Sequence, residues 1–221
     1  MRETSLADAQ AIAAPSPRRI ASIGLDLIER AILIALFWGL AGRLLVNYAA
    51  THNIANLLAL VSEGMVVVLA MIRRTPQNIT FRIDDWALAF GGACATLFLR
   101  PITMASVGPS EIGWALQAIG FLGALWCKAA LFRNFGVAPA IRGVEVRGPY
   151  AFLRHPMYAS YFIAQLGFLY AFPTLWNAAI IAIWAAIQVL RINAEERLLK
   201  TDARYQNYAA QVRWRLIPRF Y

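Results

Sequence analysis

Side chains that could do chemistry crowd into a twelve-residue run from Arg147 to Tyr158, which reads RGPYAFLRHPMY. His155 precedes a proline and therefore favours an extended or turn conformation. Pro156 suits the first position of a following helix, whose free N–H groups attract a carboxylate or another anion. The run predicts a polar binding site at the mouth of a helix, although an Arg/His/Tyr anchor at a membrane interface uses the same residue types.

A second group of charged residues follows in the segment 191–200, RINAEERLLK. Arg191 and Glu195 are four residues apart and share one face of a helix, as do Glu196 and Lys200. We interpret the Glu196–Lys200 pair as a solvated ion pair. Glu195 is expected about one turn beyond the membrane boundary, close to His155, where its carboxylate could hold the ammonium of an amino-acid moiety.

The C-terminal tail carries aromatic residues at helical spacing. Tyr205, Tyr208 and Val212 recur at i, i+3 and i+7, the pattern of a helix that lays one face on an apolar surface. This helix, which we expect to end at Pro218, could be an amphipathic interfacial helix or the lid of a pocket.

The elements that position these groups are expected to lie in a membrane. Hydrophobic residues make up 60% of the chain and charged residues 15%, against about 25% charged residues in soluble domains. A membrane span needs about 20 mainly apolar residues. Four segments fit, namely 27–48, 54–72, 86–104 and 112–132. A fifth apolar stretch, 157–190, is interrupted at Pro173 and predicts a helical hairpin. The expected fold is an all-α integral membrane protein with four single-span helices and a C-terminal helical hairpin.

Charge placement predicts the orientation. Eighteen of the 21 lysines and arginines belong to segments on one predicted side, so the positive-inside rule makes both termini cytoplasmic. The other three, Arg43, Arg100 and Lys128, lie in or beside spans and are interpreted as snorkelling to the interface. Glu63 falls mid-span, where a charge is costly, and must face a partner or a cavity.

The chain is expected to divide into three regions. Residues 1–22 form a cytoplasmic tail, 23–132 the four spans, and 133–221 a catalytic, cofactor-binding region. The net charge of +9 is attributed to contact with anionic membrane lipids rather than nucleic acid. The two cysteines lie in apolar segments and match no metal or redox motif, so no metal site is predicted.

Taken together, the R-G-P-Y-x₃-R-H-P-x-Y run, the apolar hairpin, R-x₃-E-E and a Y-x₂-Y-x₃-V-x₅-P tail resemble the isoprenylcysteine carboxyl methyltransferase family. More broadly they resemble the membrane methyltransferases that include phospholipid N-methyltransferases. The resemblance covers about residues 134–218. It implies an all-helical membrane fold with S-adenosylmethionine in a pocket open to the cytosol, and a prenylated or otherwise lipophilic acceptor that enters from the bilayer.

The resemblance also implies roles for individual residues. Glu195 and Arg191 are the implied catalytic residues, with Arg191 near the acceptor carboxylate. The implied cofactor contacts are Arg142, Gly143, Val144, Glu145, Tyr150, His155, Pro156, Met157, Tyr158 and Glu195. The stretch 142–145 reads Arg-Gly-Val-Glu where the family commonly has His-x-Leu-Val.

The chemistry of methyl transfer suits these residues. Transfer from a sulfonium is an in-line displacement, so the protein must mainly hold donor and acceptor in near-attack geometry. A carboxylate acceptor is already ionised and needs only orientation, which Arg191 could provide by a charge-assisted contact. An amine acceptor would need a proton acceptor, for which Glu196 or His155 are candidates.

Other functions remain open from the sequence. A lipid amine or a small thiol could be methylated on the same scaffold. Sterol-reductase-like membrane enzymes, which bind NADPH, also end in a Tyr-x-x-Tyr, proline-terminated tail, but the R-H-P-x-Y run and the glutamate pair argue against them. A non-catalytic membrane scaffold or carrier is the remaining alternative.

Overall fold

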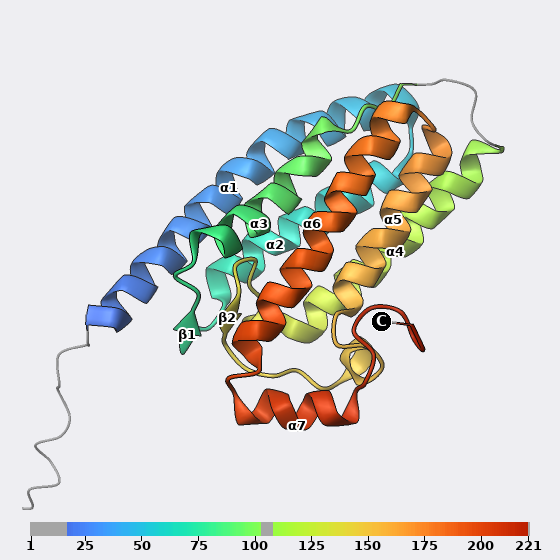
Figure 1. Ribbon diagram of the computed structural model, residues 1–221. Coiled ribbons are helices and arrows are strands. Elements are labelled where there is room, and N and C mark those ends of the chain that lie inside the picture. Colours follow the sequence, from blue (N-terminus) through green and yellow to red (C-terminus); the bar gives the residue numbers. More distant parts are fainter. Residues whose placement is uncertain (1–16, 103–107, 221) are drawn as a thin grey trace, which may run out of the picture.

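The computed structural model describes residues 17–102 and 108–220, which form a bundle of helices capped at one end by loops (Figure 1). Within these residues the seven α-helices are α1 (Pro17–Thr51), α2 (Ile54–Ile72), α3 (Ile83–Ala95), α4 (Ser110–Leu131), α5 (Pro156–Ala171), α6 (Leu175–Leu199) and α7 (Ala203–Gln211). The short elements are strands β1 (Asn78–Ile79) and β2 (Ala140–Ile141) and the 3₁₀ turns η2 (Thr96–Phe98), η3 (Phe132–Asn134) and η4 (Gly148–Ala151). The predicted all-α fold is confirmed in being mostly helical, and the β1–β2 pair is an addition that the sequence did not predict.

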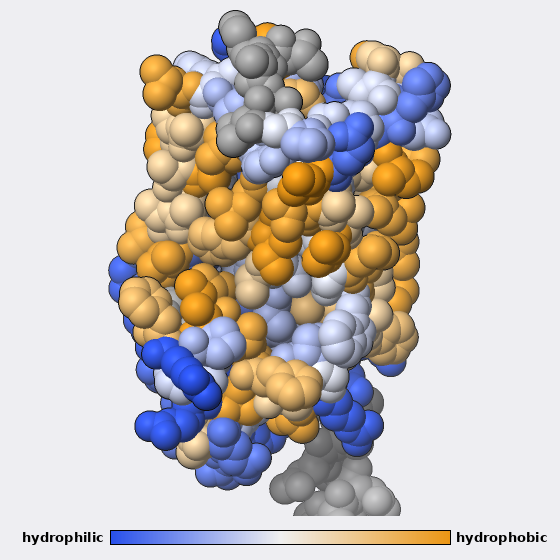
Figure 2. All heavy atoms as spheres, turned by 90° about the vertical axis from the view of Figure 1, so that its right-hand side faces the viewer, coloured by the Kyte–Doolittle hydropathy of each residue, from blue (hydrophilic) through white to orange (hydrophobic). Residues whose placement is uncertain are grey.

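The surface of the bundle suits a lipid environment. Three helices in the described part of the chain are long and apolar enough to cross a membrane, namely Ile54–Ile72, Ser110–Asn134 and Leu175–Leu199. Large apolar side chains such as Trp38, Val68 and Leu166 are exposed. On the face drawn in Figure 2, hydrophobic side chains form a belt between hydrophilic ends. The chain is therefore an integral, multi-pass membrane protein.

The C-terminal hairpin forms as the sequence predicts. α5 and α6 are joined by Phe172, Pro173 and Thr174, and the Thr174 hydroxyl caps α6 by accepting from the Asn177 N–H at 3.1 Å. The Asn177 side chain in turn donates to the Phe172 carbonyl oxygen at 2.9 Å. α6 continues nine residues beyond the expected arm and carries the charged segment on the same helix.

The third predicted span, 86–104, is too long. α3 ends at Ala95 and only the 3₁₀ turn η2 follows it; Met104 lies outside the described residues. A 13-residue helix rises about 20 Å, short of the roughly 30 Å hydrocarbon core. Pro101 disfavours helical backbone at Arg100, whose guanidinium instead stacks 4.4 Å from the centroid of the Trp176 ring.

Glycines bring α4 and α5 into close contact. A methyl group added at Gly120 would lie 2.5 Å from the Ala164 nitrogen, and one at Gly113 would lie 2.8 Å from the Gly167 carbonyl oxygen. Small residues of this kind let helix backbones approach within a membrane. The contact fixes α5, which begins inside the R-H-P-x-Y run.

The segments predicted to face the cytoplasm gather at one end of the bundle. The β1–β2 ribbon, which pairs Asn78 with Ile141, lies there with η4, α7 and the start of α1 (Figure 1). Residues 17–22 of the expected tail are helical, and residues 1–16 lie outside the described part. The α1–α2 and α5–α6 turns lie at the opposite end. Loop 133–156 and segment 191–221 can therefore frame one site.

Candidate active site

Glu195, whose side chain is half-buried, is the centre of a cluster at the C-terminal end of α6. The Tyr158 hydroxyl donates to Glu195 Oε1, and His155 Nδ1 lies 3.8 Å from Glu195 Oε2. One turn earlier, the Arg191 guanidinium lies 5.3 Å from the centroid of the Tyr158 ring. The structure thus brings together four residues that the sequence separates into two motifs.

Glu196, the next residue, turns toward the C-terminal tail and is buried, with 2% of its side chain exposed. The predicted pair with Lys200 forms, at 3.4 Å, but only Lys200 reaches the surface. Glu196 also lies within 3.0–3.3 Å of Arg154, His155, Tyr205 and Arg215. Because a buried charge requires such partners, Glu196 joins α6 to the R-H-P-x-Y run and the C-terminal tail.

The C-terminal tail holds the R-H-P-x-Y run through its backbone. The N–H groups of Arg154 and His155 donate to the carbonyl oxygens of Trp214 and Arg215, each at 2.9 Å. This pairing requires extended chain, so the prediction that the tail helix runs to Pro218 is wrong: α7 ends at Gln211.

The tyrosines of α7 pack inward, as their spacing predicts. Tyr205 and Tyr208 are 4% and 5% exposed, whereas Val212 is half-buried. The Tyr208 hydroxyl donates to the Tyr150 carbonyl oxygen at 2.7 Å and to that of Leu153 at 3.2 Å. Burial raises the pKa of both α7 tyrosines, so their hydroxyls remain protonated donors at neutral pH.

A small cavity lies between this tail, α6 and the loop before η4, and we call it the loop cavity. Its walls include these predicted cofactor residues: Arg142, Gly143, Val144, Glu145, Tyr150, His155, Met157, Tyr158 and Glu195. Pro156 is not in the wall; it is the first residue of α5. The Oδ1 of Asn134, another wall residue, is buried without a hydrogen-bond partner in the described chain.

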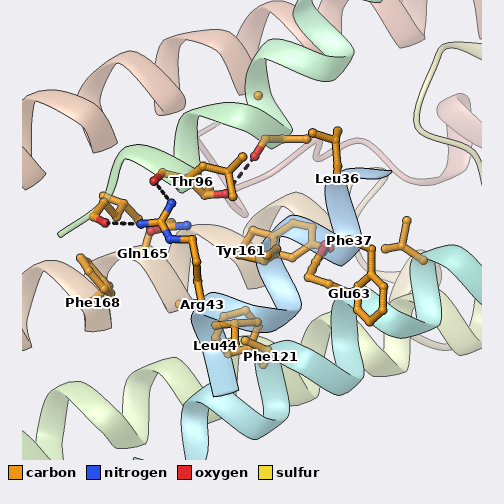
Figure 3. Close-up of a pocket in the computed structure, with 18 of the residues that line it drawn as sticks. Leu36, Phe37, Arg43, Leu44, Glu63, Thr96, Phe121, Tyr161, Gln165 and Phe168 are labelled. Carbon is orange, nitrogen blue, oxygen red and sulfur yellow. Dashed lines mark hydrogen bonds between the residues drawn. The ribbon is translucent and has the colours of Figure 1, made fainter. Parts of the chain in front are cut away.

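A larger cavity of about 630 Å³ lies inside the bundle, and we call it the bundle cavity (Figure 3). Its wall is mainly apolar and includes Phe37, Phe121 and Trp184. Arg191 belongs to this wall and not to that of the loop cavity. The two cavities share three wall residues, Gly136, Met157 and Tyr158.

Of the three predicted intramembrane cations, Lys128 does not snorkel to the interface. Lys128 is fully buried and donates to the Ser62 carbonyl oxygen and hydroxyl at 2.6 and 2.8 Å. Arg43 donates to the carbonyl oxygens of Leu97 and Leu99 at the wall of the bundle cavity. Acceptors within the bundle thus replace the interface for Lys128. Arg43 and Arg100 are exposed, and the Arg100 guanidinium stacks on a tryptophan ring.

The sequence also conceals a buried ion cluster beneath the loop cavity. Arg142 is 3% exposed, and its guanidinium pairs with Asp26 at 3.0 Å and lies 3.5 Å from Glu29. Arg73 pairs with the same two carboxylates, each at 2.7 Å. The side chain of Arg142 is therefore engaged with α1, which leaves its backbone to face a ligand. Only the Asp26–Arg30 spacing of i, i+4 hinted that these acids have partners.

Glu29 reaches the active-site loop directly. Its Oε1 accepts from the N–H groups of Val137 and Ala138 at 2.8 and 3.1 Å. The Val137 carbonyl oxygen accepts from Arg191 Nη2 at 3.2 Å. One peptide segment thus connects a carboxylate of α1 to the arginine of α6, a connection that sequence spacing does not reveal.

Comparisons with known proteins give one match, to a family model. No curated protein and no solved structure gives a significant match. Residues 114–201 match the model of the isoprenylcysteine carboxyl methyltransferase (ICMT) family. The matched segment contains the R-H-P-x-Y run, the hairpin and the glutamate pair. Over these residues the chain is similar to the isoprenylcysteine carboxyl methyltransferase family, whose members are enzymes that use S-adenosylmethionine as methyl donor.

Proposed function

We propose that this enzyme methylates the carboxylate of a lipophilic acceptor of the isoprenylcysteine type. The observation that carries the proposal is the meeting of two unlike cavities at Gly136, Met157 and Tyr158. The loop cavity, the more polar of the two, has Glu195 in its wall, and the mainly apolar bundle cavity has Arg191. A polar, cationic donor and a lipophilic, anionic acceptor would meet at such a junction.

The residues of the loop cavity suit S-adenosylmethionine. When bound, this cofactor supplies an electrophilic methyl group on a sulfonium. Glu195 offers a carboxylate to its ammonium and is oriented by the Tyr158 hydroxyl. The unpaired Asn134 Oδ1 is a further acceptor in the wall. At about 110 Å³ the cavity is smaller than the roughly 300–1,000 Å³ of most small-molecule sites, so the ligand must also use the shared junction or displace the loop.

Arg191 is suited to orient an acceptor carboxylate. Its Nη1 donates to Gln188 Oε1 at 3.0 Å and its Nη2 to the Val137 carbonyl oxygen at 3.2 Å. Its buried Nε has no hydrogen-bond partner in the described chain. The guanidinium is therefore held in place with a donor left over, and the acceptor's apolar chain would fill the bundle cavity. Orientation and exclusion of water are what this displacement requires of the protein.

The environment of the candidate bases favours a carboxylate acceptor over an amine or thiol. Both of those need a proton acceptor. Glu196 is surrounded by Arg154, His155, Lys200 and Arg215, so it is unsuited to taking up a proton. His155 Nε2 lies 3.3 Å from Glu196, and His155 belongs to the wall of the loop cavity and not to that of the bundle cavity.

We further propose that the loop cavity faces the cytoplasm. The lysines and arginines concentrate at the end of the bundle that carries α7 and the loop cavity. The positive-inside rule assigns that end to the cytoplasm.

Transfer of a radiolabelled methyl group tests the acceptor class. Purified protein is given labelled S-adenosylmethionine with N-acetyl-farnesylcysteine, phosphatidylethanolamine or a small thiol in parallel. We expect label in the base-labile ester of the farnesylcysteine compound only. Label in the lipid amine or the thiol alone would replace the carboxylate proposal. Calorimetric titration with S-adenosylmethionine and with NADPH is expected to show binding of the first only.

A further inference from the structure

Glu63 lies in the middle of α2, in the wall of the bundle cavity (Figure 3). Its side chain is 29% exposed, whereas its partner Lys128 is fully buried. As the sequence predicts, this intramembrane charge has both a partner and a cavity. An apolar acceptor chain alone gives no reason for a carboxylate at this position.

The hydrogen bonds of Glu63 leave one of its oxygens available. Oε1 accepts from Lys128 Nζ at 3.3 Å and from the Tyr161 hydroxyl at 3.2 Å. Oε2 receives no hydrogen bond from the described residues. Lys128 uses its three N–H groups on Ser62 and Glu63, so it has none to offer a ligand. At Glu63 the cavity wall therefore presents a hydrogen-bond acceptor whose own cation has no donor left for a ligand.

Charge balance decides which donor fits. Lys128 already neutralises Glu63, so an ammonium placed beside the pair would add an uncompensated charge in apolar surroundings, which is strongly unfavourable. A neutral N–H or O–H group adds a hydrogen bond to a charged acceptor without that penalty.

Glu63 also lies near the proposed acceptor carboxylate. Tyr161, which binds Glu63, is one turn beyond Tyr158 on α5, and Arg191 stacks over Tyr158. Glu63, Tyr161 and Arg191 all belong to the wall of the bundle cavity. We propose that Glu63 accepts a hydrogen bond from a neutral N–H or O–H group that the acceptor carries close to its carboxylate. This inference rests on the proposed function and narrows its substrate class.

A matched ligand pair tests the inference by binding, without methyl transfer. N-oleoylglycine has an amide N–H beside its carboxylate, and N-oleoylsarcosine has an N-methyl group instead. Each displaces radiolabelled N-oleoylglycine from the purified protein in detergent. We expect the wild type to bind the N–H compound about tenfold to hundredfold more tightly, the range for a hydrogen bond to a charged group.

The variant Glu63→Met/Lys128→Met removes both charges together, because loss of one partner alone would leave a buried charge. We expect this double variant to bind N-oleoylglycine and N-oleoylsarcosine about equally. Glu63→Asp keeps the ion pair but moves the carboxylate back from the cavity. It should lose most of the preference for N-oleoylglycine over N-oleoylsarcosine. This variant tests the inference if the double variant does not fold. Gln165→Leu, which removes another polar group of the same wall, should keep the wild-type ratio.

Several results would overturn the inference. The first is a wild type that binds N-oleoylglycine and N-oleoylsarcosine equally. The second is a wild-type affinity ratio in Glu63→Asp or in the double variant. The third is loss of that ratio in Gln165→Leu. Tighter binding of the secondary amine N-oleylglycine than of the amide would replace the neutral donor by a cation. If the protein methylates no carboxylate, the proposed function is contradicted. The binding ratios do not depend on methyl transfer and still decide whether Glu63 accepts this hydrogen bond.

Discussion

Adjacent residues on a helix point about 100° apart, and this rotation gives the two glutamates at the end of α6 different surroundings. Glu195 turns toward the loop cavity with 20% of its side chain exposed. Glu196 turns toward the tail and is almost fully buried among basic groups. The same side chain can thus bind a ligand at one position and hold the fold together at the next.

Neutralising each glutamate should therefore have a different effect. We expect Glu195→Gln to weaken S-adenosylmethionine binding about tenfold to hundredfold, because an interaction with a charged group is lost, with little change in stability. Glu196→Gln should destabilise the protein by about 3–5 kcal/mol, because Arg154, His155 and Arg215 lose their common counter-ion. Calorimetric titration and thermal unfolding measure the two effects, and an interchange of the two patterns would contradict these assignments.

Arg191 gives a second test at the residue scale. If it orients the acceptor carboxylate, Arg191→Ala should lower kcat/KM for a carboxylate acceptor about tenfold to hundredfold and leave the affinity for S-adenosylmethionine nearly unchanged. Arg191→Lys should recover little, because a lysine cannot reproduce the planar guanidinium fork. Arg204→Ala, which removes an exposed arginine of α7, is the control and should match the wild type. If Arg191→Ala lowers the affinity for S-adenosylmethionine as much as it lowers kcat/KM, Arg191 stabilises the fold and does not specifically orient the acceptor.

The sequence could reveal a site residue only when the partner of that residue lies close to it in the sequence. Arg191 and Glu195 share a helix face four residues apart, and His155 and Tyr158 share one short motif, so each pair could be predicted. Glu29 could not, because its partners at positions 73 and 137–138 come from other elements. The interpretation of Lys128 as a snorkelling residue was wrong because its acceptors lie on Ser62 of a different helix.

At the scale of elements, the tail and the R-H-P-x-Y run act as one unit. α7 contributes the Tyr208 hydroxyl, and the extended chain after it contributes the carbonyl oxygens of Trp214 and Arg215. The hairpin and the inward face of α7 follow from proline placement and helical spacing, so both were predictable. The early end of α7 was not, because it depends on contacts with residues 154–155 that lie far away in the sequence. The early end of α3 was missed although Pro101 disfavours helical backbone at Arg100.

Removing the Tyr208 hydroxyl tests this unit. Tyr208→Phe loses two hydrogen bonds to carbonyl oxygens and should lower stability by about 1–3 kcal/mol, with a fall in Tm of about 2–12 °C for a chain of this size. KM for S-adenosylmethionine should rise more than KM for the acceptor. Tyr48→Phe, near the end of α1 that lies away from the loop cavity, is the control and should change neither quantity.

Because of the Tyr208 hydroxyl, we also expect the stability of the protein to depend on pH. Burial raises the pKa of Tyr208 above its ordinary value of 10.0, so the folded state disfavours ionisation that the unfolded chain allows. Its contribution to stability should be complete below about pH 10 and should decline as the pH rises further. The measurement is the difference in unfolding free energy between the wild type and Tyr208→Phe at about pH 8 and at about pH 11, on either side of the unfolded pKa. We expect this difference to be smaller at the higher pH. The same difference at both pH values would contradict the prediction.

At the scale of the whole molecule, the site extends beyond the segment that matches the family. α1 precedes residues 114–201, yet its Glu29 holds the Val137–Ala138 backbone that in turn contacts Arg191. We expect Glu29→Gln to destabilise the protein by about 3–5 kcal/mol and to lower kcat/KM for the acceptor. Arg30→Ala removes a more exposed partner of the same ion cluster and should cost about 1 kcal/mol or less. Equal effects of the two substitutions would deny Glu29 a special role.

Orientation in the membrane is the property on which the cytoplasmic site depends. The α5–α6 turn and α7 lie at opposite ends of the bundle (Figure 1), and positions 175 and 207 are exposed at these ends. Leu175→Cys and Asn207→Cys are each placed in a background with Cys94→Ala and Cys127→Ala. In right-side-out vesicles a membrane-impermeant maleimide should label position 175 only, and in inverted vesicles position 207 only. The reverse pattern would place the loop cavity outside the cell, and labelling of both positions from one side would mean that the bundle does not cross the membrane end to end.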